Sequence, residues 1–324
     1  MKQYLVTGCA GFIGAKVAEK LLAQGQGVVG IDDLNDYYDP GLKEWRLRQL
    51  QSHDNFQFTR GDVRDRKTVE ALYQSHHFDA TFNLAARAGV RASVEDPWIY
   101  YQTNTEGTLN LLECSRQYGV NKFMLASTSS IYGMTDTPFS VSNRTDTPLS
   151  PYAASKKAAE AMAYSYHYLY GIDVFIPRYF TVYGPAGRPD MSYFNFILKI
   201  DKGLPIDVFG DGGQSRDFTF VDDVADATVR GLALRGYHIY NVGNDRPVEL
   251  LKMIRLLEQL MEKEVKINFH DRHPADNLIT WADLSETEKL LNWKPGTPLE
   301  TGLRKVLEWY RENREWLSKI KISS

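Results

Sequence analysis

A glycine-rich turn between a short β-like run and a helical pattern constrains the fold of this chain more than any other feature. Residues 4–7 are rich in β-formers, and residues 8–14, Gly-Cys-Ala-Gly-Phe-Ile-Gly, follow them directly. Ile13, Val17 and Leu21 then fall four apart and form one apolar stripe of helical period. Glycine is needed where a side chain would block a tight turn. The pattern predicts a strand, a turn and a helix in immediate succession.

Further β-rich runs alternate with helical patterns over the first half of the chain. With the first run, they lie at residues 4–7, 28–31, 56–60, 81–84 and 123–126. Such alternation predicts a parallel sheet with helices on both faces. We therefore expect an α/β protein with a Rossmann-type, doubly wound parallel sheet.

After about residue 177 the alternation gives way to segments interrupted by Pro and Gly. This change predicts a smaller C-terminal α/β domain that shares a cleft with the first. Helical patterns recur near residues 190–202, 221–233, 247–262 and 299–313. The expected division assigns residues 1–177, with a returning segment near 217–245, to the first domain, and residues 178–216 and 246–324 to the second.

The composition excludes several classes of partner. The 324 residues are 43% hydrophobic and 24% charged with a formal net charge of −3, so we expect a globular protein without the basic face of a nucleic-acid-binding protein. No apolar run approaches the roughly 20 residues that span a bilayer. Cys9 and Cys114 show neither zinc spacing nor a disulfide framework, and His167, His270 and His273 show no metal-ligand spacing. We expect no metal, nucleic-acid or membrane partner and, without a signal peptide, a cytoplasmic location.

The glycine turn and a following acid predict a dinucleotide site. Gly8, Gly11 and Gly14 let a pyrophosphate approach the start of the first helix. The next strand ends in Asp32, 18 residues beyond Gly14, where a carboxylate can accept both ribose hydroxyls of an adenosine. Because Asp32 would repel a 2′-phosphate, NAD is favoured over NADP.

A Tyr-x-x-x-Lys spacing predicts an acid–base site. Tyr152 and Lys156 lie four apart at the start of an Ala-rich helix, so both project from one face. A nearby ammonium favours the phenolate, which can act as a general base on a sugar hydroxyl. Residues 125–133 add a strand that ends in four consecutive hydroxyl residues, and the carboxyl end of such a strand faces the ligand crevice.

These three motifs, in this order, resemble the extended short-chain dehydrogenase/reductases, the NAD-dependent nucleotide-sugar epimerase/dehydratase family, over essentially the whole chain. The resemblance implies a triad of Thr128, Tyr152 and Lys156, with NAD as cofactor. It also implies that Asp62 and Val63 contact adenine. The cofactor-binding residues expected are Gly8, Gly11, Phe12, Ile13, Gly14, Asp32, Asn35, Asp62, Val63, Leu84, Ala85, Ala86, Asn104, Tyr152, Lys156, Tyr179 and Val182.

The residues after Thr128 indicate which reaction follows the shared oxidation at the sugar C4. Family dehydratases carry an Asp-Glu pair directly after the Thr, and those places here are Ser129 and Ser130. The Glu of family UDP-glucuronate decarboxylases is missing as well. The simplest remaining reaction is 4-epimerisation through a transient 4-keto intermediate, with Tyr152 as base.

Residues 32–47 and 178–191 resemble one subgroup, the UDP-glucuronate 4-epimerases. Arg188 in the second segment lies just after a strand end, where its guanidinium can hold the substrate carboxylate in a bidentate pair. A firm hold matters because a 4-keto uronic acid is a β-keto acid that loses CO₂ readily. The sequence departs from the subgroup at Asp33, Arg87 and Ala275, where Asn, Gln and Gly are usual.

The remaining substrate contacts also follow from the resemblance. Arg216 would bind the diphosphate, Phe209 the uracil and Asp276 the ribose. The substrate-binding residues expected for the UDP-sugar are Arg87, Ser127, Thr128, Tyr152, Thr181, Arg188, Phe209, Arg216 and Asp276.

Two other functions remain open from the sequence. A UDP-glucose or UDP-N-acetylglucosamine 4-epimerase would leave Arg188 facing solvent and turn Arg87 toward a phosphate. A catalytically idle NAD-binding scaffold would make no use of Tyr152. The aromatic residues between positions 164 and 170, together with the family resemblance, predict a homodimer through this helix.

Overall fold

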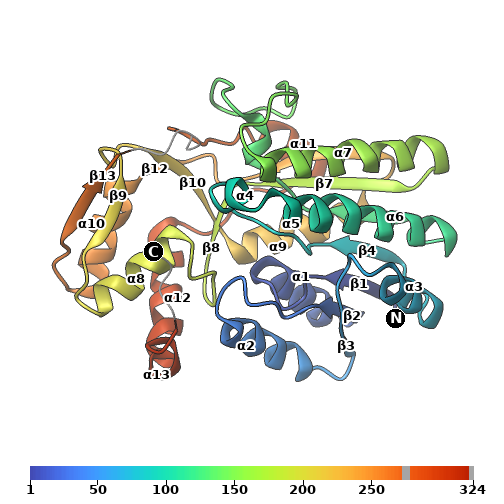
Figure 1. The fold of residues 1–324 in the computed structure, drawn as a ribbon, viewed down its shortest axis with the longest axis horizontal. Helices are drawn as coiled ribbons and strands as arrows, with labels where there is room; N and C mark the ends of the chain where they lie inside the picture. Colours follow the sequence, from blue (N-terminus) through green and yellow to red (C-terminus); the bar gives the residue numbers. More distant parts are fainter. Residues whose placement is uncertain (272–277, 321–324) are drawn as a thin grey trace.

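A parallel sheet forms the centre of the molecule. The computed structural model describes residues 1–271 and 278–320, and within them the largest sheet has eight strands. Seven follow the order β11-β7-β5-β4-β1-β2-β3, and β6 (Ser127–Thr128) pairs with β7 (Figure 1). All of these pairings are parallel. The seven are β1 (Gln3–Thr7), β2 (Gly27–Asp32), β3 (Phe56–Arg60), β4 (Ala80–Asn83), β5 (Lys122–Leu125), β7 (Asp173–Tyr179) and β11 (Tyr237–Val242).

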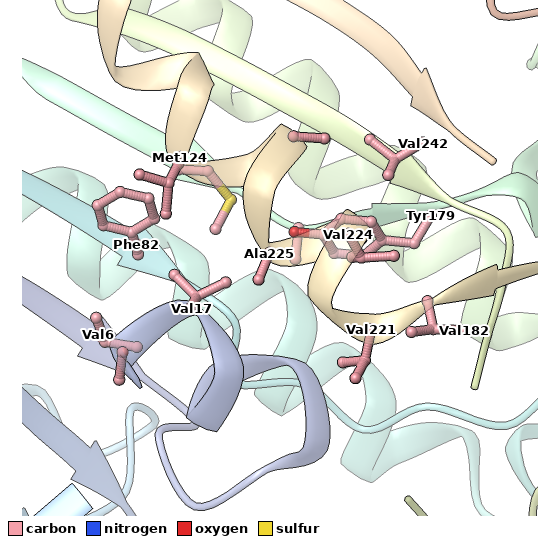
Figure 2. Close-up of a cluster of buried hydrophobic side chains, with 14 of the residues drawn as sticks. Val6, Val17, Phe82, Met124, Tyr179, Val182, Val221, Val224, Ala225 and Val242 are labelled. Carbon is pink, nitrogen blue, oxygen red and sulfur yellow. The ribbon is translucent and has the colours of Figure 1, made fainter. Parts of the chain in front are cut away.

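Helices cover both faces of this sheet because its strands are apolar on both sides. Tyr4 and Val6 of β1 face one hydrophobic cluster, and Leu5 between them faces another. Successive side chains of a strand point to opposite faces, so a doubly covered strand must be apolar throughout. The first cluster contains α1 (Phe12–Ala23) and α9 (Val221–Arg230), and Figure 2 shows Val17 and Val224 of these helices among its members. The second contains α3 (Arg66–Ser75), α6 (Gly107–Gln117) and α7 (Pro151–Tyr170).

The strand order reverses at β1, which lies between β4 and β2. In an open α/β sheet, ligands bind beyond the carboxyl ends of the strands at such a point. The loops after β1 and β4 therefore border the expected ligand crevice.

A smaller unit lies beside the main sheet (Figure 1). Its hydrophobic cluster contains Phe194, Ile254 and Leu303, all fully buried. One of its sheets has the order β12-β10-β8, and β13 pairs with β9 in another. Its elements are β8 (Thr181–Tyr183), α8 (Ser192–Asp201), β9 (Ile206–Phe209), β10 (Ser215–Phe220), β12 (Pro247–Glu249), α10 (Leu250–Met261), β13 (Ile267–His270), α12 (Leu299–Glu312) and α13 (Arg314–Leu317).

The remaining elements are short, except for α2. They are α2 (Pro40–Gln51), α4 (Ala92–Glu95), α5 (Pro97–Tyr101), the π-helix η1 (Gln102–Glu106), the 3₁₀-helices η2 (Ser129–Tyr132) and η3 (Gly231–Ala233), and α11 (Ser285–Leu291).

The predicted fold class is confirmed, and most predicted elements lie within a residue or two of their expected bounds. One prediction is wrong at its start: residues 247–249 form β12 and not a helix turn. The reason is tertiary, because Val248 pairs with Arg216 of β10 in an antiparallel ladder. Where the chain divides into domains stays a prediction. None of the helices in the described ranges is long and apolar enough to cross a membrane.

Candidate active site

The glycine turn has no space for a side chain at Gly8 or Gly14. A Cβ at Gly14 would lie 2.1 Å from the carbonyl oxygen of Gly8, and a Cβ at Gly8 would lie 2.8 Å from the Ala85 nitrogen. Gly11 is the N-cap of α1, and no side chain in the described residues caps this helix. The positive end of a helix beside a bare glycine turn suits a phosphate group. The Phe12 side chain belongs to the first hydrophobic cluster and the Ile13 side chain packs against it, so the backbone of these two residues is the part open to the turn.

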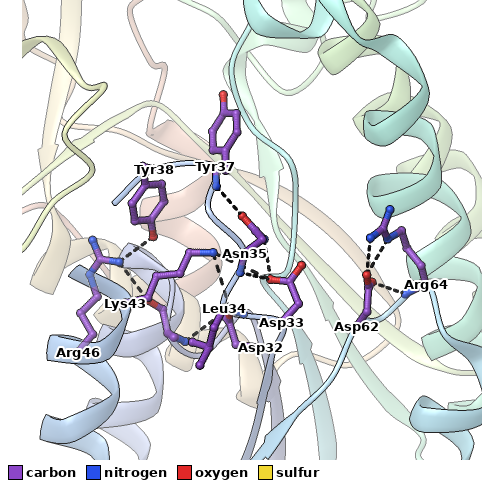
Figure 3. Close-up of polar contacts among 11 residues, drawn as sticks. Asp32, Asp33, Leu34, Asn35, Tyr37, Tyr38, Lys43, Arg46, Asp62 and Arg64 are labelled. Carbon is purple, nitrogen blue, oxygen red and sulfur yellow. Dashed lines mark hydrogen bonds and ion pairs between the residues drawn. The ribbon is translucent and has the colours of Figure 1, made fainter. Parts of the chain in front are cut away.

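Asp32 ends β2 in a buried, polar setting (Figure 3). Its carboxylate accepts hydrogen bonds from the backbone of Ala10 (3.1 Å) and Leu34 (2.9 Å). The Lys43 ammonium lies 4.0 Å from both Asp32 and Asp33. Burial raises the pKa of Asp32, and Lys43 acts in the opposite direction. Asn35 donates its side-chain amide to Asp33, which fixes the loop after the strand.

The expected adenine contacts lie beyond β3, away from this cluster in Figure 3. Burial would raise the pKa of Asp62, but hydrogen bonds from Arg64 lower it below its ordinary value. Two of these bonds come from the guanidinium, at 2.8 and 2.5 Å. Val63 is buried. The Asp62 carboxylate, which was predicted to contact adenine, is therefore already paired with Arg64.

The loop after β4 joins the glycine turn to the catalytic helix. The Thr7 hydroxyl accepts from the backbone of Leu84 (3.1 Å) and Ala85 (3.0 Å), which fixes Leu84–Ala86 beside the turn. Asn104 exchanges two hydrogen bonds with the backbone of Arg87 and donates a third to the Ser155 hydroxyl (2.9 Å). Asn104, which the sequence predicts as a cofactor-binding residue, thus lies between the loop and α7.

Tyr152 is hydrogen-bonded to Thr128, and Lys156 follows Tyr152 by four residues on the same helix. Helix α7 begins after Ser150, whose hydroxyl accepts from the Ala153 nitrogen at 3.2 Å, and Pro151 occupies its first position. These are strong helix-start signals, and they place Tyr152 and Lys156 in the first two turns. Thr128 lies on β6 beside them and caps η2 by accepting from the Ser130 nitrogen.

The electrostatics of this group differ between its members. Burial raises the pKa of Tyr152, while a hydrogen bond with Thr128 and the positive charge of Arg188 lower it. Burial also lowers the pKa of Lys156 to about 8, with Glu160 opposing the shift. Tyr152 is thus a half-buried residue whose phenolate is stabilised by Arg188 as well as by Thr128.

A buried ion pair joins α7 to β7, the strand that pairs with β6 of Thr128. Glu160 and Arg178 form two hydrogen bonds of 3.0 and 2.9 Å, with side chains only 1% and 2% exposed. Ser127 donates its hydroxyl to Glu160 at 2.6 Å. Because that proton is committed, Ser127 has only its acceptor capacity left for a substrate. Arg178 also donates to the Tyr132 hydroxyl in η2 (3.0 Å).

Two arginines converge on one tyrosine at the sugar end of the site. The guanidinium carbons of Arg87 and Arg188 lie 5.1 and 5.6 Å from the centre of the Tyr37 ring. Tyr37 donates its hydroxyl to the Ala88 carbonyl at 2.6 Å. Arg188 forms a bidentate pair with Asp190, at 3.0 and 2.5 Å, and its side chain is 19% exposed. Its guanidinium therefore lies over the Tyr37 ring, mostly shielded from solvent, and its charge lowers the pKa of Tyr152.

The residues predicted for the nucleotide lie on the smaller unit. Phe209 ends β9 and is 37% exposed, and the Arg91 guanidinium lies 4.3 Å from the centre of its ring. Arg216 lies on β10 and donates to the Ser215 carbonyl, and Thr181 begins the neighbouring β8. Asp276 lies outside the described residues, as do His273 and Ala275.

Two predicted cofactor residues point their side chains elsewhere. Tyr179 and Val182 belong to the hydrophobic cluster of Figure 2, and the Tyr179 hydroxyl lies 2.9 Å from that of Thr228.

Sequence reasoning missed four side chains around the site: Tyr37, Lys43, Arg46 and Glu160. Glu160 alone carried a local signal, since it lies four residues after Lys156 on the same helix face. The other three belong to residues 32–47, where the sequence showed a resemblance without a role.

Comparisons with known proteins agree with this geometry. Residues 4–243 match the model of the NAD dependent epimerase/dehydratase family. The chain is 50% identical over 323 residues to the UDP-glucuronate 4-epimerase of Thermodesulfobacterium geofontis, covering 99% of this chain and 100% of that protein.

Two solved structures are similar over nearly their whole length. One is the UDP-glucuronic acid 4-epimerase of Bacillus cereus in complex with UDP-glucuronic acid and NAD, at 35% identity and a TM-score of 0.91, covering 96% of this chain and 99% of that one. The other is the UDP-glucose 4-epimerase of Thermotoga maritima with UDP-glucose, at 30% identity and a TM-score of 0.89, with the same coverage. From its motifs, its fold and these matches, the chain belongs to the NAD-dependent epimerase/dehydratase family.

Proposed function

We propose that this protein catalyses the NAD-dependent 4-epimerisation of UDP-glucuronate to UDP-galacturonate. The observation that carries this function is the position of Arg188. Its guanidinium lies 5.6 Å from the centre of the Tyr37 ring, and the Tyr37 hydroxyl is 3.5 Å from that of Tyr100. The Tyr100 ring in turn packs edge to face against Tyr152, and the charge of Arg188 lowers the pKa of that phenol. A substrate with a carboxylate near its reacting carbon matches that arrangement.

The catalytic residues act on the C4 hydroxyl. Tyr152 accepts its proton as general base, and the Thr128 hydroxyl, bonded to the same phenol, holds the C4 oxygen in line. NAD, which the glycine turn and Asp32 would hold, would supply the hydride acceptor for C4 and, once reduced, the donor for the other face of the sugar. Tyr152 then gives its proton back to the C4 oxygen. Lys156 is buried beside them, and because its pKa is about 8 its own ammonium keeps a positive charge next to the site at neutral pH.

Arg188 holds the carboxylate through this sequence. The 4-keto uronate is a β-keto acid, and CO₂ leaves when its C–C bond aligns with the carbonyl π system. A bidentate guanidinium fixes the plane of a carboxylate better than a single ammonium does. Asp190, already paired with Arg188, keeps the guanidinium oriented. Arg87, across the Tyr37 ring, is a second contact for the anionic substrate.

We also propose that the two units bind different molecules, the main sheet NAD and the smaller unit the nucleotide sugar. The main sheet, with residues 1–177 and a segment near 217–245, holds NAD through the glycine turn, Asp32 and Lys156. Residues 178–216 and 246–324 hold the nucleotide sugar through Arg188, Phe209 and Arg216. The glycine cradle and the uncapped α1 fit the pyrophosphate of NAD.

A kinetic comparison tests the function. We expect kcat/KM for UDP-glucuronate to exceed that for UDP-glucose by about a hundredfold or more, the value of a charge-assisted bidentate pair. Tyr152→Phe should bind UDP-glucuronate but lose almost all turnover. Equal or better turnover of UDP-glucose or UDP-N-acetylglucosamine would identify a neutral-sugar epimerase. Unchanged turnover in Tyr152→Phe would identify a different base.

A homodimer is part of the same proposal. The outer half of α7 carries Tyr168 and Leu169, which are 76% and 63% exposed. Aromatic and aliphatic side chains of this kind suit a subunit interface. Sedimentation should give twice the chain mass at micromolar concentration, and Tyr168→Glu with Leu169→Glu should halve it. A monomeric wild-type protein would contradict the dimer.

We further propose that the protein works in the cytoplasm. Its two thiols, Cys9 and Cys114, are both free and buried, which suits a reducing compartment. Cell fractionation tests the location, and recovery from an extracytoplasmic fraction would contradict it.

A further inference from the structure

Arg46 of α2 joins two loops of the site that are far apart in sequence. Its guanidinium is buried, with the residue only 3% exposed. It donates to the Ala186 carbonyl twice, at 2.8 and 2.7 Å, and to the Gly187 carbonyl at 3.1 Å. It also donates to the Ala10 carbonyl at 3.0 Å. One side chain therefore contacts both the glycine turn and the two residues that precede Arg188.

The loop that Arg46 holds needs an external constraint. Ala186 has a φ of +52°, a left-handed conformation that is costly for a residue with a Cβ. Gly187 has no space for a side chain, because a Cβ there would lie 1.7 Å from the Tyr193 hydroxyl oxygen. Such a backbone persists only where its surroundings fix it. The fork of Arg46, matched to the Ala186 and Gly187 carbonyls, is one such constraint.

Helix α2 also packs on both parts of the molecule. Leu47 and Leu50 belong to the hydrophobic cluster of the main sheet, and Leu42 belongs to that of the smaller unit. The Trp45 ring meets Trp309 of α12 edge to face, 5.4 Å between centres. Arg46 thus projects from a helix that is anchored on both sides of the cleft, and Tyr38 accepts a further hydrogen bond from it at 2.7 Å (Figure 3).

We propose that Arg46 is a positioning residue that couples the cofactor turn to the loop of Arg188. Through Ala10 it fixes the turn where the pyrophosphate is expected, and through Ala186 and Gly187 it sets the direction of the Arg188 side chain. The part of this inference that concerns the substrate rests on the proposed function. The part that concerns the cofactor rests only on the contact between Arg46 and the glycine turn.

The geometry gives a direct test by chemical rescue. A cavity of about 130 Å³ lies against Arg46, lined by Phe12, Trp45, Pro185 and Ala186 among others. In Arg46→Ala, a methylguanidinium ion can enter from this cavity and donate to the same carbonyls. Arg48→Ala is the matched control, because Arg48 lies on the same helix with an exposed side chain.

We expect Arg46→Ala to bind NAD at least about tenfold more weakly, as measured by fluorescence titration, because a charged donor to the turn is lost. We expect its KM for UDP-glucuronate to rise at least about tenfold and the share of decarboxylated UDP-pentose to increase. Millimolar methylguanidinium should restore all three quantities in Arg46→Ala and change none in Arg48→Ala. A folded Arg46→Ala with wild-type NAD affinity and KM would overturn the proposal.

Two further arms keep the test decisive. If Arg46→Ala does not fold, Arg46→Lys keeps the charge and bulk but not the fork, and should show the same defects in smaller measure. A wild-type affinity and KM in Arg46→Lys would then overturn the proposal. If the wild-type protein does not turn over UDP-glucuronate, the proposed function fails, but the NAD titration and its rescue still decide whether Arg46 positions the glycine turn.

Discussion

At the scale of single residues, Lys156 shows a conflict between stability and function. It is buried, and its pKa of about 8 lies below the 10.5 of an exposed lysine. Between about pH 8 and 10.5, the folded state therefore binds fewer protons than the unfolded state. Below about pH 8, the buried charge of Lys156 lowers the free energy of unfolding by its full amount, and this destabilisation decreases as the pH rises toward 10.5. We expect Lys156→Met to raise the free energy of unfolding at pH 7 by up to ~3 kcal/mol while abolishing turnover. Urea unfolding at pH 7 and 9.5 measures the effect, and a gain that does not shrink at pH 9.5 would refute this cause.

Arg188 gives the second prediction at this scale. We expect Arg188→Ala to lower kcat/KM for UDP-glucuronate by on the order of 100-fold and to release UDP-pentose, because the carboxylate is no longer held. Arg188→Lys should recover only part of the loss, since an ammonium cannot match a carboxylate with two parallel bonds. Product analysis by NMR measures both effects. Wild-type kinetics in Arg188→Ala would remove the carboxylate assignment.

How far the sequence predicts individual residues depends on how local their interactions are. The pairing of Tyr152 with Lys156 was predictable because the two share a helix face. A hydroxyl at the end of a neighbouring strand was predictable as well, but it was the family resemblance that singled out Thr128 among four consecutive hydroxyl residues. Arg46 was not, because its partner Ala186 lies 140 positions away and no periodicity connects them. Tyr179 shows the opposite case, since its place near the cofactor was expected but its ring faces the core.

At the scale of elements, the turn between β1 and α1 depends on the absence of a side chain. A Cβ at Gly14 would lie 2.1 Å from the Gly8 carbonyl oxygen, too close for any adjustment of a side chain to relieve. We expect Gly14→Ala to abolish NAD binding and to lower the melting temperature by several degrees. Gly27→Ala on β2 is the control, because its nearest neighbour would be 3.5 Å away. Calorimetry with NAD measures both variants, and normal affinity in Gly14→Ala would contradict the turn geometry.

The ion pair between α7 and β7 makes another prediction at this scale. Removing one partner of a buried pair leaves an uncompensated charge, which costs roughly 3–5 kcal/mol. We expect Glu160→Gln to destabilise the protein by about that amount, because Arg178 stays buried. Glu300→Gln removes an exposed pair with Arg304 on α12 and should cost under about 1 kcal/mol. Equal losses of stability in the two variants would mean that burial does not increase the contribution of the Glu160–Arg178 pair.

Elements were predictable where periodicity and capping agree. Helix α7 has Ser150, Pro151 and an apolar face, and its start matches the expectation. Residues 247–249 were assigned to a helix because their neighbours carry helical period, but pairing with β10 makes them a strand. A short strand held by one partner leaves no pattern of its own in the sequence.

At the scale of the whole molecule, the proposed site lies where two hydrophobic cores meet, and the two units contribute different residues to it. The main sheet supplies the glycine turn, Thr128 and the catalytic helix, and the smaller unit supplies Phe209 and Arg216. Residues 32–47 lie between them, and α2 within this segment packs on both cores. The fold class followed from the alternation of strands and helices, but the meeting of these cores depends on contacts between distant segments. That is why the sequence pointed to this segment without assigning its role.

The most direct test of the central claim follows a label at the reacting carbon. UDP-glucuronate that carries deuterium at C4 is incubated with the purified protein in ordinary water, and the product is examined by NMR. We expect UDP-galacturonate that retains the deuterium at C4, because the hydrogen removed from one face is returned to the other within the same site. Loss of the label to water, a UDP-pentose as the main product, or no conversion of the uronate would contradict it.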